Sequence, residues 1–198
     1  MSTNQAQKNI ITSLKKADGA KMGKFLGGGV IALGVTSILA PYSPGNFMVA
    51  EFAHASQNAG AFGVVVGSLI MASSFVVATA HENIAKLKFK KLVKDYGSAE
   101  EKHGADSIEK GSDMAARNVW AVIGLAGTAA ATAATVMYPS ISAAVGVGVL
   151  TIASTLFGTA ANEEQIKRNQ ENRLDLGRAI IDRRAKNTSV PSSQSPSF

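Results

Sequence analysis

The chain of 198 residues contains no cysteine. This absence excludes disulfide bonds, thiolate nucleophiles and cysteine-based zinc or iron–sulfur sites. Charge is also missing over long stretches: no Asp, Glu, Lys or Arg occurs in 25–50, 52–81 or 118–162. Soluble domains carry charge on the elements that reach water, so these stretches indicate contact with lipid.

Four segments within these stretches have about the 20 residues that a helix needs to cross hydrocarbon. They are Phe25–Tyr42, Ala59–Ala80, Asn118–Met137 and Ile141–Ala161. The residue before a proline avoids the helical region, so Tyr138-Pro139-Ser140 predicts a tight turn. The sequence therefore predicts an all-α integral membrane protein with four transmembrane helices in two hairpins. The alternative, a buried helical hairpin of a soluble protein, is disfavoured by apolar runs of about 18 residues or more.

Basic residues flank the four segments and are absent from the turn within each hairpin. Of the 20 Lys and Arg, five precede the first segment, eight lie between the second and third, and seven follow the fourth. The positive-inside rule places both termini and the central loop on the inner side. We expect an N-in, C-in protein of the bacterial inner membrane. A cleaved signal peptide ending at Ala40 is the alternative, and the long basic start and Pro41 disfavour it.

The resulting organisation has six parts, with charged helices beside the membrane on the inner face. They are a basic N-terminal inner-face segment (1–24), the first transmembrane hairpin (25–81), a basic inner-face helix and connector (82–117), the second transmembrane hairpin (118–161), a charged inner-face helix (162–186) and a disordered tail (187–198). Glycine and mixed charge within Gly97–Asp113 predict a flexible connector. The Ser/Pro-rich composition predicts the disorder of the tail.

Small residues recur every four positions along the predicted spans. The candidate helix-packing residues are Gly28, Ala32, Thr36, Gly63, Gly67, Ala126, Ala130, Ser154 and Gly158. Lipid tails are as apolar as leucine, so helices associate in a bilayer through the close backbone approach that such residues permit. The pattern is compatible with packing inside the chain or with self-association and contacts to other membrane proteins.

The two hairpins resemble each other in sequence. Residues 67–74 align with residues 148–155, and Glu82 and Lys86 then match Glu163 and Lys167. Both units run in the same orientation, unlike the inverted repeats of many secondary transporters. This orientation counts against an alternating-access carrier.

A basic amphipathic helix is predicted over Glu82–Tyr96. Its candidate lipid-headgroup residues are Lys86, Lys88, Lys90, Lys91 and Lys94. Such a helix beside a span is typical of contact with anionic lipid headgroups. The alternative is a solvated continuation of the second span. Since the basic residues flank apolar spans, we expect lipid and not nucleic acid as the partner of the chain's net positive charge.

Catalytic and metal-binding patterns are missing from the sequence. His54, His81 and His103 lie in separate segments without ligand spacing. Glu51 and His54 are three residues apart and are typical of a solvated loop pair. No charged residue lies inside a predicted span, although proton relays and ion pathways normally need one. We therefore expect no enzyme, no cofactor and no metal site.

The leading functional hypothesis is a non-catalytic multi-pass membrane protein that acts as a structural or assembly component of a membrane complex. One alternative is an oligomeric pore or holin-like channel lined by Ser, Thr and Gly, since uncharged polar walls suit poorly selective conduction. A second alternative is a bacterial effector that inserts its two hairpins into a host membrane.

Overall fold

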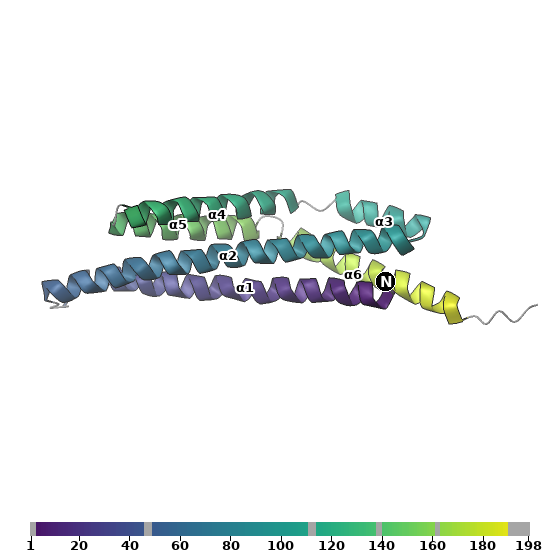
Figure 1. The fold of residues 1–198 in the computed structure, drawn as a ribbon, viewed down its shortest axis with the longest axis horizontal. Coiled ribbons are helices and arrows are strands. Elements are labelled where there is room, and N and C mark those ends of the chain that lie inside the picture. Colours follow the sequence, from purple (N-terminus) through teal and green to yellow (C-terminus); the bar gives the residue numbers. More distant parts are fainter. Residues whose placement is uncertain (1–2, 46–48, 111–113, 138–139, 161–162, 190–198) are drawn as a thin grey trace, which may run out of the picture. The chain divides into compact units, whose positions relative to one another are not determined.

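The computed structural model describes residues 3–45, 49–110, 114–137, 140–160 and 163–189. These residues form α-helices and one short 3-10 helix (Figure 1). The elements are α1 (Thr3–Leu39), η1 (Ala40–Tyr42), α2 (Ala50–Tyr96), α3 (Ala99–Lys110), α4 (Met114–Met137), α5 (Ile141–Ala160) and α6 (Glu163–Ser189). Strands are absent from these residues, so the all-α prediction is confirmed.

Helices α1, α2, α4 and α5 are long and apolar enough to cross a membrane. α2 and α4 contain the second and third predicted segments in full, α1 contains the first up to Leu39, and α5 contains the fourth up to Ala160. α2 has 47 residues, so the predicted basic helix is a continuation of the second apolar segment. α1 ends at Leu39, because Pro41 enters the following 3-10 turn. Gly45 then adopts a φ of 83°, a conformation that glycine accepts without steric cost.

Ala99–Lys110, within the predicted flexible connector, forms the helix α3. The Glu101 N–H donates to Ser98 Oγ at 3.2 Å, and the Ser98 N–H donates to the Glu101 carboxylate at 2.7 Å. This reciprocal capping box satisfies two backbone donors that a helix start otherwise leaves unpaired. The predicted turn at 138–139 and the predicted disorder of 190–198 lie outside the described residues.

The chain forms two compact units. The charged unit comprises Met1–Leu14, Asn83–Asp113 and Asn162–Phe198. The hairpin unit comprises Lys15–Glu82 and Met114–Ala161. α1 and α2 each contribute to both units, whereas α3 and α6 belong to the charged unit and α4 and α5 to the hairpin unit.

In the hairpin unit, α1 runs antiparallel to α2 and α4 runs antiparallel to α5 (Figure 1). Its buried apolar cluster consists of Ile31, Ile38, Val64 and Met71 from α1 and α2. Side chains of α5 pack against this cluster; they include Ile141, Val145 and Ile152. The two hairpins therefore share one core.

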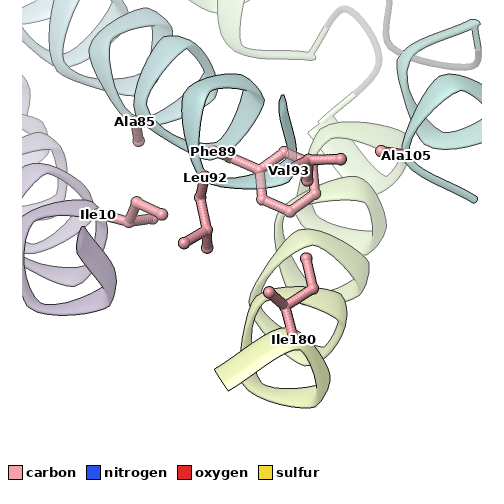
Figure 2. Packing of buried hydrophobic residues seen from close by; sticks show 7 residues of the cluster. All are labelled: Ile10, Ala85, Phe89, Leu92, Val93, Ala105 and Ile180. Carbon is pink, nitrogen blue, oxygen red and sulfur yellow. The ribbon is translucent and has the colours of Figure 1, made fainter. Parts of the chain in front are cut away.

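In the charged unit, apolar side chains from four helices meet (Figure 2). The cluster consists of Ile10 from α1, Ala85, Phe89, Leu92 and Val93 from α2, Ala105 from α3 and Ile180 from α6. These segments are far apart in the sequence. The unit therefore depends on contacts that periodicity within any one helix does not predict.

Candidate functional site

Glycine pairs bring α1 and α2 into close contact. A Cβ placed on Gly67 would lie 2.7 Å from the Gly27 carbonyl oxygen, and one on Gly34 would lie 2.6 Å from the Gly60 carbonyl oxygen. Any side chain at these positions would push the backbones apart. We call this contact between α1 and α2 the internal seam. Close backbone approach of this kind is how helices pack in lipid.

α4 and α5 are joined by buried hydroxyl groups. Thr151 Oγ1 donates to the Val147 carbonyl oxygen at 2.8 Å, so Thr128 Oγ1 donates to Thr151 Oγ1, also at 2.8 Å. Thr128 and Thr151 are both fully buried. A Cβ on Gly124 would lie 2.9 Å from Ser154 Oγ, so this seam is also closely packed. An interhelical hydrogen bond of this kind contributes about 0.6–2 kcal/mol within a membrane.

Two glycines of α5 mark where the hairpins meet. A Cβ on Gly148 would lie 2.9 Å from the Val64 side chain and 3.5 Å from Ile31. Gly67, the residue that matches Gly148 in the sequence repeat, also contacts Ile31. A Cβ on Gly158 would lie 2.5 Å from the Phe75 ring. Ile31 and Phe75 therefore occupy space that only glycine leaves open.

The sequence-predicted packing residues fall into two groups. Those on the chain's own helix contacts are Gly63, Gly67, Ser154 and Gly158, with Gly63 at the edge of its seam. Those that face away from these contacts are Gly28, Ala32, Thr36, Ala126 and Ala130. On α1 the internal seam uses Gly27 in place of Gly28. Successive helical residues are rotated by about 100°, so a shift of one residue changes the face.

A charged cluster lies at one end of the hairpin unit. The Glu82 side chain on α2 is 1% exposed, and one of its carboxylate oxygens lies 3.3 Å from Arg117 Nη1 on α4. The other lies 3.1 Å from Lys21 Nζ on α1. Arg117 is itself only 3% exposed. One buried carboxylate therefore connects three helices and both hairpins.

Phe75 extends this cluster to the fourth helix. Lys24 Nζ lies 5.8 Å and the Arg117 guanidinium carbon 6.0 Å from the centroid of the Phe75 ring. Both distances allow a cation–π interaction, which strengthens when the groups are desolvated. Because the same ring fills the space at Gly158, the cluster brings side chains of α1, α2 and α4 to a glycine of α5.

Sequence reasoning missed Glu82 and Arg117, which lie just outside the predicted spans Ala59–Ala80 and Asn118–Met137. The repeat gave no indication either. Glu163, which matches Glu82, is exposed and pairs with Lys167 at 3.5 Å within one helix. The only available signal was the opposite charge of Glu82 and Arg117 at facing ends of the two hairpins.

The five predicted headgroup lysines have different surroundings. Lys86 and Lys90 contact Glu109 of α3 at 3.0 and 2.9 Å. Lys88 Nζ donates to the Asn9 carbonyl oxygen at 3.2 Å and to Ser13 Oγ at 2.8 Å. These three side chains connect helices of the charged unit. Lys91 and Lys94 are exposed and make no such contact among the described residues.

Glu109 joins three helices of the charged unit, because Arg173 of α6 also approaches it at 3.6 Å. Burial raises the pKa of Glu109, but hydrogen bonds from Lys90 and Lys86 and the charges of Lys86 and Arg173 lower it more. The pKa of Glu109 therefore lies below its usual value of 4.5. Burial also lowers the pKa of the Arg173 guanidinium, and the charge of Glu109 opposes this shift.

A second ion pair connects α3 with α6. Arg183 donates to both carboxylate oxygens of Glu101, at 3.1 and 2.8 Å, and to the Tyr96 carbonyl oxygen at 2.9 Å. The hydrogen bond from Arg183 holds the pKa of Glu101 below its usual value. The Arg184 guanidinium lies 4.5 Å from the centroid of the Tyr96 ring. These contacts anchor α6 at the end of α2.

Within the part of the chain that the structure describes, no three His, Asp or Glu residues gather closely enough to hold a metal ion. The charged clusters pair their carboxylates with Lys and Arg and thereby hold helices together. No protein-family model, curated protein or solved structure matches this chain.

Proposed function

We propose that the chain is a non-catalytic multi-pass membrane protein that serves as a structural or assembly component of a membrane complex. The observation that carries this proposal is a second small-residue face on α1. Gly28, Ala32 and Thr36 face away from the chain's own helices, while Gly27 and Gly34 form the internal seam. In lipid, such a face supports close contact with another helix.

α4 supports the same proposal. Only 17% of the residues in its most apolar stretch are buried, compared with 39% for α2 and for α5. Ala126 and Ala130 are among its residues that are not buried. A helix with so little cover from its own chain and with small outward residues suits a contact with a neighbouring protein.

The position of the hydroxyl groups favours assembly over an oligomeric pore. Ser68, Thr128, Thr151, Ser154 and Thr155 are all buried inside the hairpin unit. A pore between copies needs polar side chains on outward faces. These five are not available to line one, which leaves exposed hydroxyls such as Thr36 and Ser73. We accordingly expect no dye leakage from liposomes that contain the purified chain.

We further propose that the chain lies in the bacterial inner membrane with both termini inside, as its Lys and Arg distribution supports. The cysteine-free background allows single cysteines to be probed from each side of the intact membrane. Ala55 and Ser142 should label from outside, and Thr12 and Ser107 only after permeabilisation; all four positions are exposed in the fold. Outside labelling of Thr12 or Ser107 would refute this topology.

Assembly is tested by enlarging the outward face. Gly28→Leu with Ala32→Leu should abolish self-association or partner copurification from native membranes, because leucine prevents close approach. Gly146→Leu is the matched control, since a Cβ on Gly146 of α5 would meet only open space. A chain that is monomeric and without partners in native lipid, before any substitution, would refute the proposal.

A further inference from the structure

The exposed face of α2 changes from apolar to basic within two helical turns. Ile84 is 39% and Leu87 65% exposed. Lys91 and Lys94 are exposed four and seven residues after Leu87, on the same side of the helix. At a rise of about 1.5 Å per residue, they lie about 6 and 10 Å further along the axis.

Some lysines of this segment bind groups of the chain itself, and the others are exposed. Lys86 and Lys90 are neutralised by Glu109, and Lys88 is held by the start of α1. Lys91 and Lys94 form no ion pair among the described residues, and their ammonium groups remain open to an external anion. The outward charge of this segment is therefore concentrated directly beyond an exposed apolar surface.

We propose that the α2 face formed by Ile84, Leu87, Lys91 and Lys94 docks on anionic phospholipids. This inference rests on the proposed membrane location. Ile84 and Leu87 contact the acyl chains, and the two ammonium groups reach the headgroup phosphates. Side chains on a helix lean toward its N-terminus, which directs both lysines back toward Leu87 and the lipid. Long basic side chains at helix ends reach the interface in this way.

Near this face, Glu109 is already paired with Lys86 and Lys90. Asp95 is a second acidic residue beside the face, and it is exposed. It lies four residues beyond Lys91, on the side away from Leu87. A basic residue followed by an acidic one is the less favourable order for an i,i+4 pair. Because lysine side chains lean the other way, Asp95 competes poorly with a phosphate for Lys91.

The test uses the full chain in nanodiscs that contain phosphatidylglycerol and phosphatidylcholine. Ile84→Cys replaces the less exposed of the two apolar residues of the face and leaves Leu87, Lys91 and Lys94 in place. The fluorescent bimane probe is therefore attached through Ala55→Cys for the outer control and through Ile84→Cys for the docking face. Quenching of the Ile84 probe by brominated phosphatidylglycerol is compared with quenching by brominated phosphatidylcholine, and stronger quenching by the anionic lipid is expected for the native lysines.

The double variant Lys91→Gln with Lys94→Gln should lose this preference by about fivefold or more, since one lysine near an anionic surface is worth about 1 kcal/mol. Lys91→Arg with Lys94→Arg should retain it. The charge-matched control is Lys102→Gln with Arg168→Gln, two residues on α3 and α6 outside this face; it should also retain the preference.

Equal quenching of the Ile84 probe by both lipids in the native chain would overturn the docking surface while leaving the membrane location intact. The docking surface would also be overturned if the Lys91/Lys94 glutamine variant keeps its preference, or if the Lys102/Arg168 control loses as much. Absence of quenching of the Ile84 probe alone would overturn the docking surface, and absence of quenching of both the Ile84 and Ala55 probes would overturn the membrane location as well.

Discussion

The charged unit buries large apolar side chains in its interior, whereas the hairpin unit exposes many of its large apolar side chains on its surface. In the charged unit, Phe89, Leu92 and Ile180 are buried, and charged side chains lie outside them. In the hairpin unit, Phe25, Leu33 and further large residues are exposed, and glycine and hydroxyl groups fill the helix contacts. Large contiguous apolar surfaces are rare on soluble monomers. The distribution of apolar side chains in the charged unit is typical of a protein in water, and that in the hairpin unit is not.

This difference teaches how each unit holds together. Removal of apolar area from water stabilises the charged unit. The hairpin unit gains little from this effect if lipid surrounds it, so close backbone contact, interhelical hydrogen bonds and the Glu82 cluster must supply its stability. Substitutions of the same kind should therefore differ in the size of their effect between the two units.

The largest expected contrast comes from truncation of phenylalanine. Phe89→Ala should destabilise the charged unit by about 3–5 kcal/mol, because it empties a buried site in the core. Phe25→Ala, at a side chain that is 75% exposed, should change the stability of the hairpin unit by less than about 0.5 kcal/mol. Hydrogen exchange of the full chain measures both effects, through the amides of α6 and α1. Similar losses in both variants would refute the contrast.

Removal of the buried carboxylate should have a comparable cost. Glu82→Gln leaves Arg117 buried without its counter-charge, which typically costs about 3–5 kcal/mol. Thermal denaturation of the purified chain in detergent measures this loss.

The double variant Glu82→Gln with Arg117→Gln is the control. It removes both buried charges, so its loss should be smaller than the sum of the two single losses. Strict additivity would show that the two side chains do not interact.

Enlargement of glycine should distinguish the helix contacts of the hairpin unit from its outward face. Gly67→Leu places a side chain against the Gly27 backbone and should cost about 1–3 kcal/mol or more. Gly29→Leu, on a side of α1 with open space around a Cβ, should be nearly neutral. Detergent denaturation of both variants tests this prediction. Equal destabilisation would mean that helix propensity, and not the seam, limits the substitution.

The smallest effect concerns pH and applies to the charged unit. The folded pKa of Glu109 lies below its usual value of 4.5, so its stabilising contribution is complete above about pH 4.5. The contribution disappears as the pH falls through the folded pKa, because the unfolded chain then binds the proton more readily. Exchange of the α3 amides should rise on acidification. Glu109→Gln should flatten this rise, and an unchanged acid response would assign it to other carboxylates.

Much of the fold could be predicted from the sequence. The charge-free stretches located the apolar parts of α1, α2, α4 and α5, and Pro41 located the end of α1. The capping box of Ser98 and Glu101 was also readable, yet the glycines and mixed charge nearby led to the prediction of a connector. Local composition was outweighed there by a helix start and by ion pairs from Lys86, Lys90 and Arg183, of which Arg183 is far away in the sequence.

The candidate site was predicted only in part. Spacing on α1 selected Gly28, Ala32 and Thr36, whereas the contact with α2 uses Gly27 and Gly34; both faces carry small residues that permit close packing. The predicted spans ended just short of Glu82 and Arg117, and nothing in the sequence indicated that these two side chains are buried. Their burial depends on the contact between the two hairpins, and periodicity within one helix does not predict such a contact.

The sequence by itself determined that the chain is helical, that four of its helices are long and apolar enough to cross a membrane, and where its charges gather. These properties follow from composition and periodicity, which act over a few turns. Only the tertiary structure decided which glycines form the seams, which lysines face outward and which carboxylate is buried. Those choices depend on the rotation of one helix against another, where one residue of register turns a side chain by about 100°.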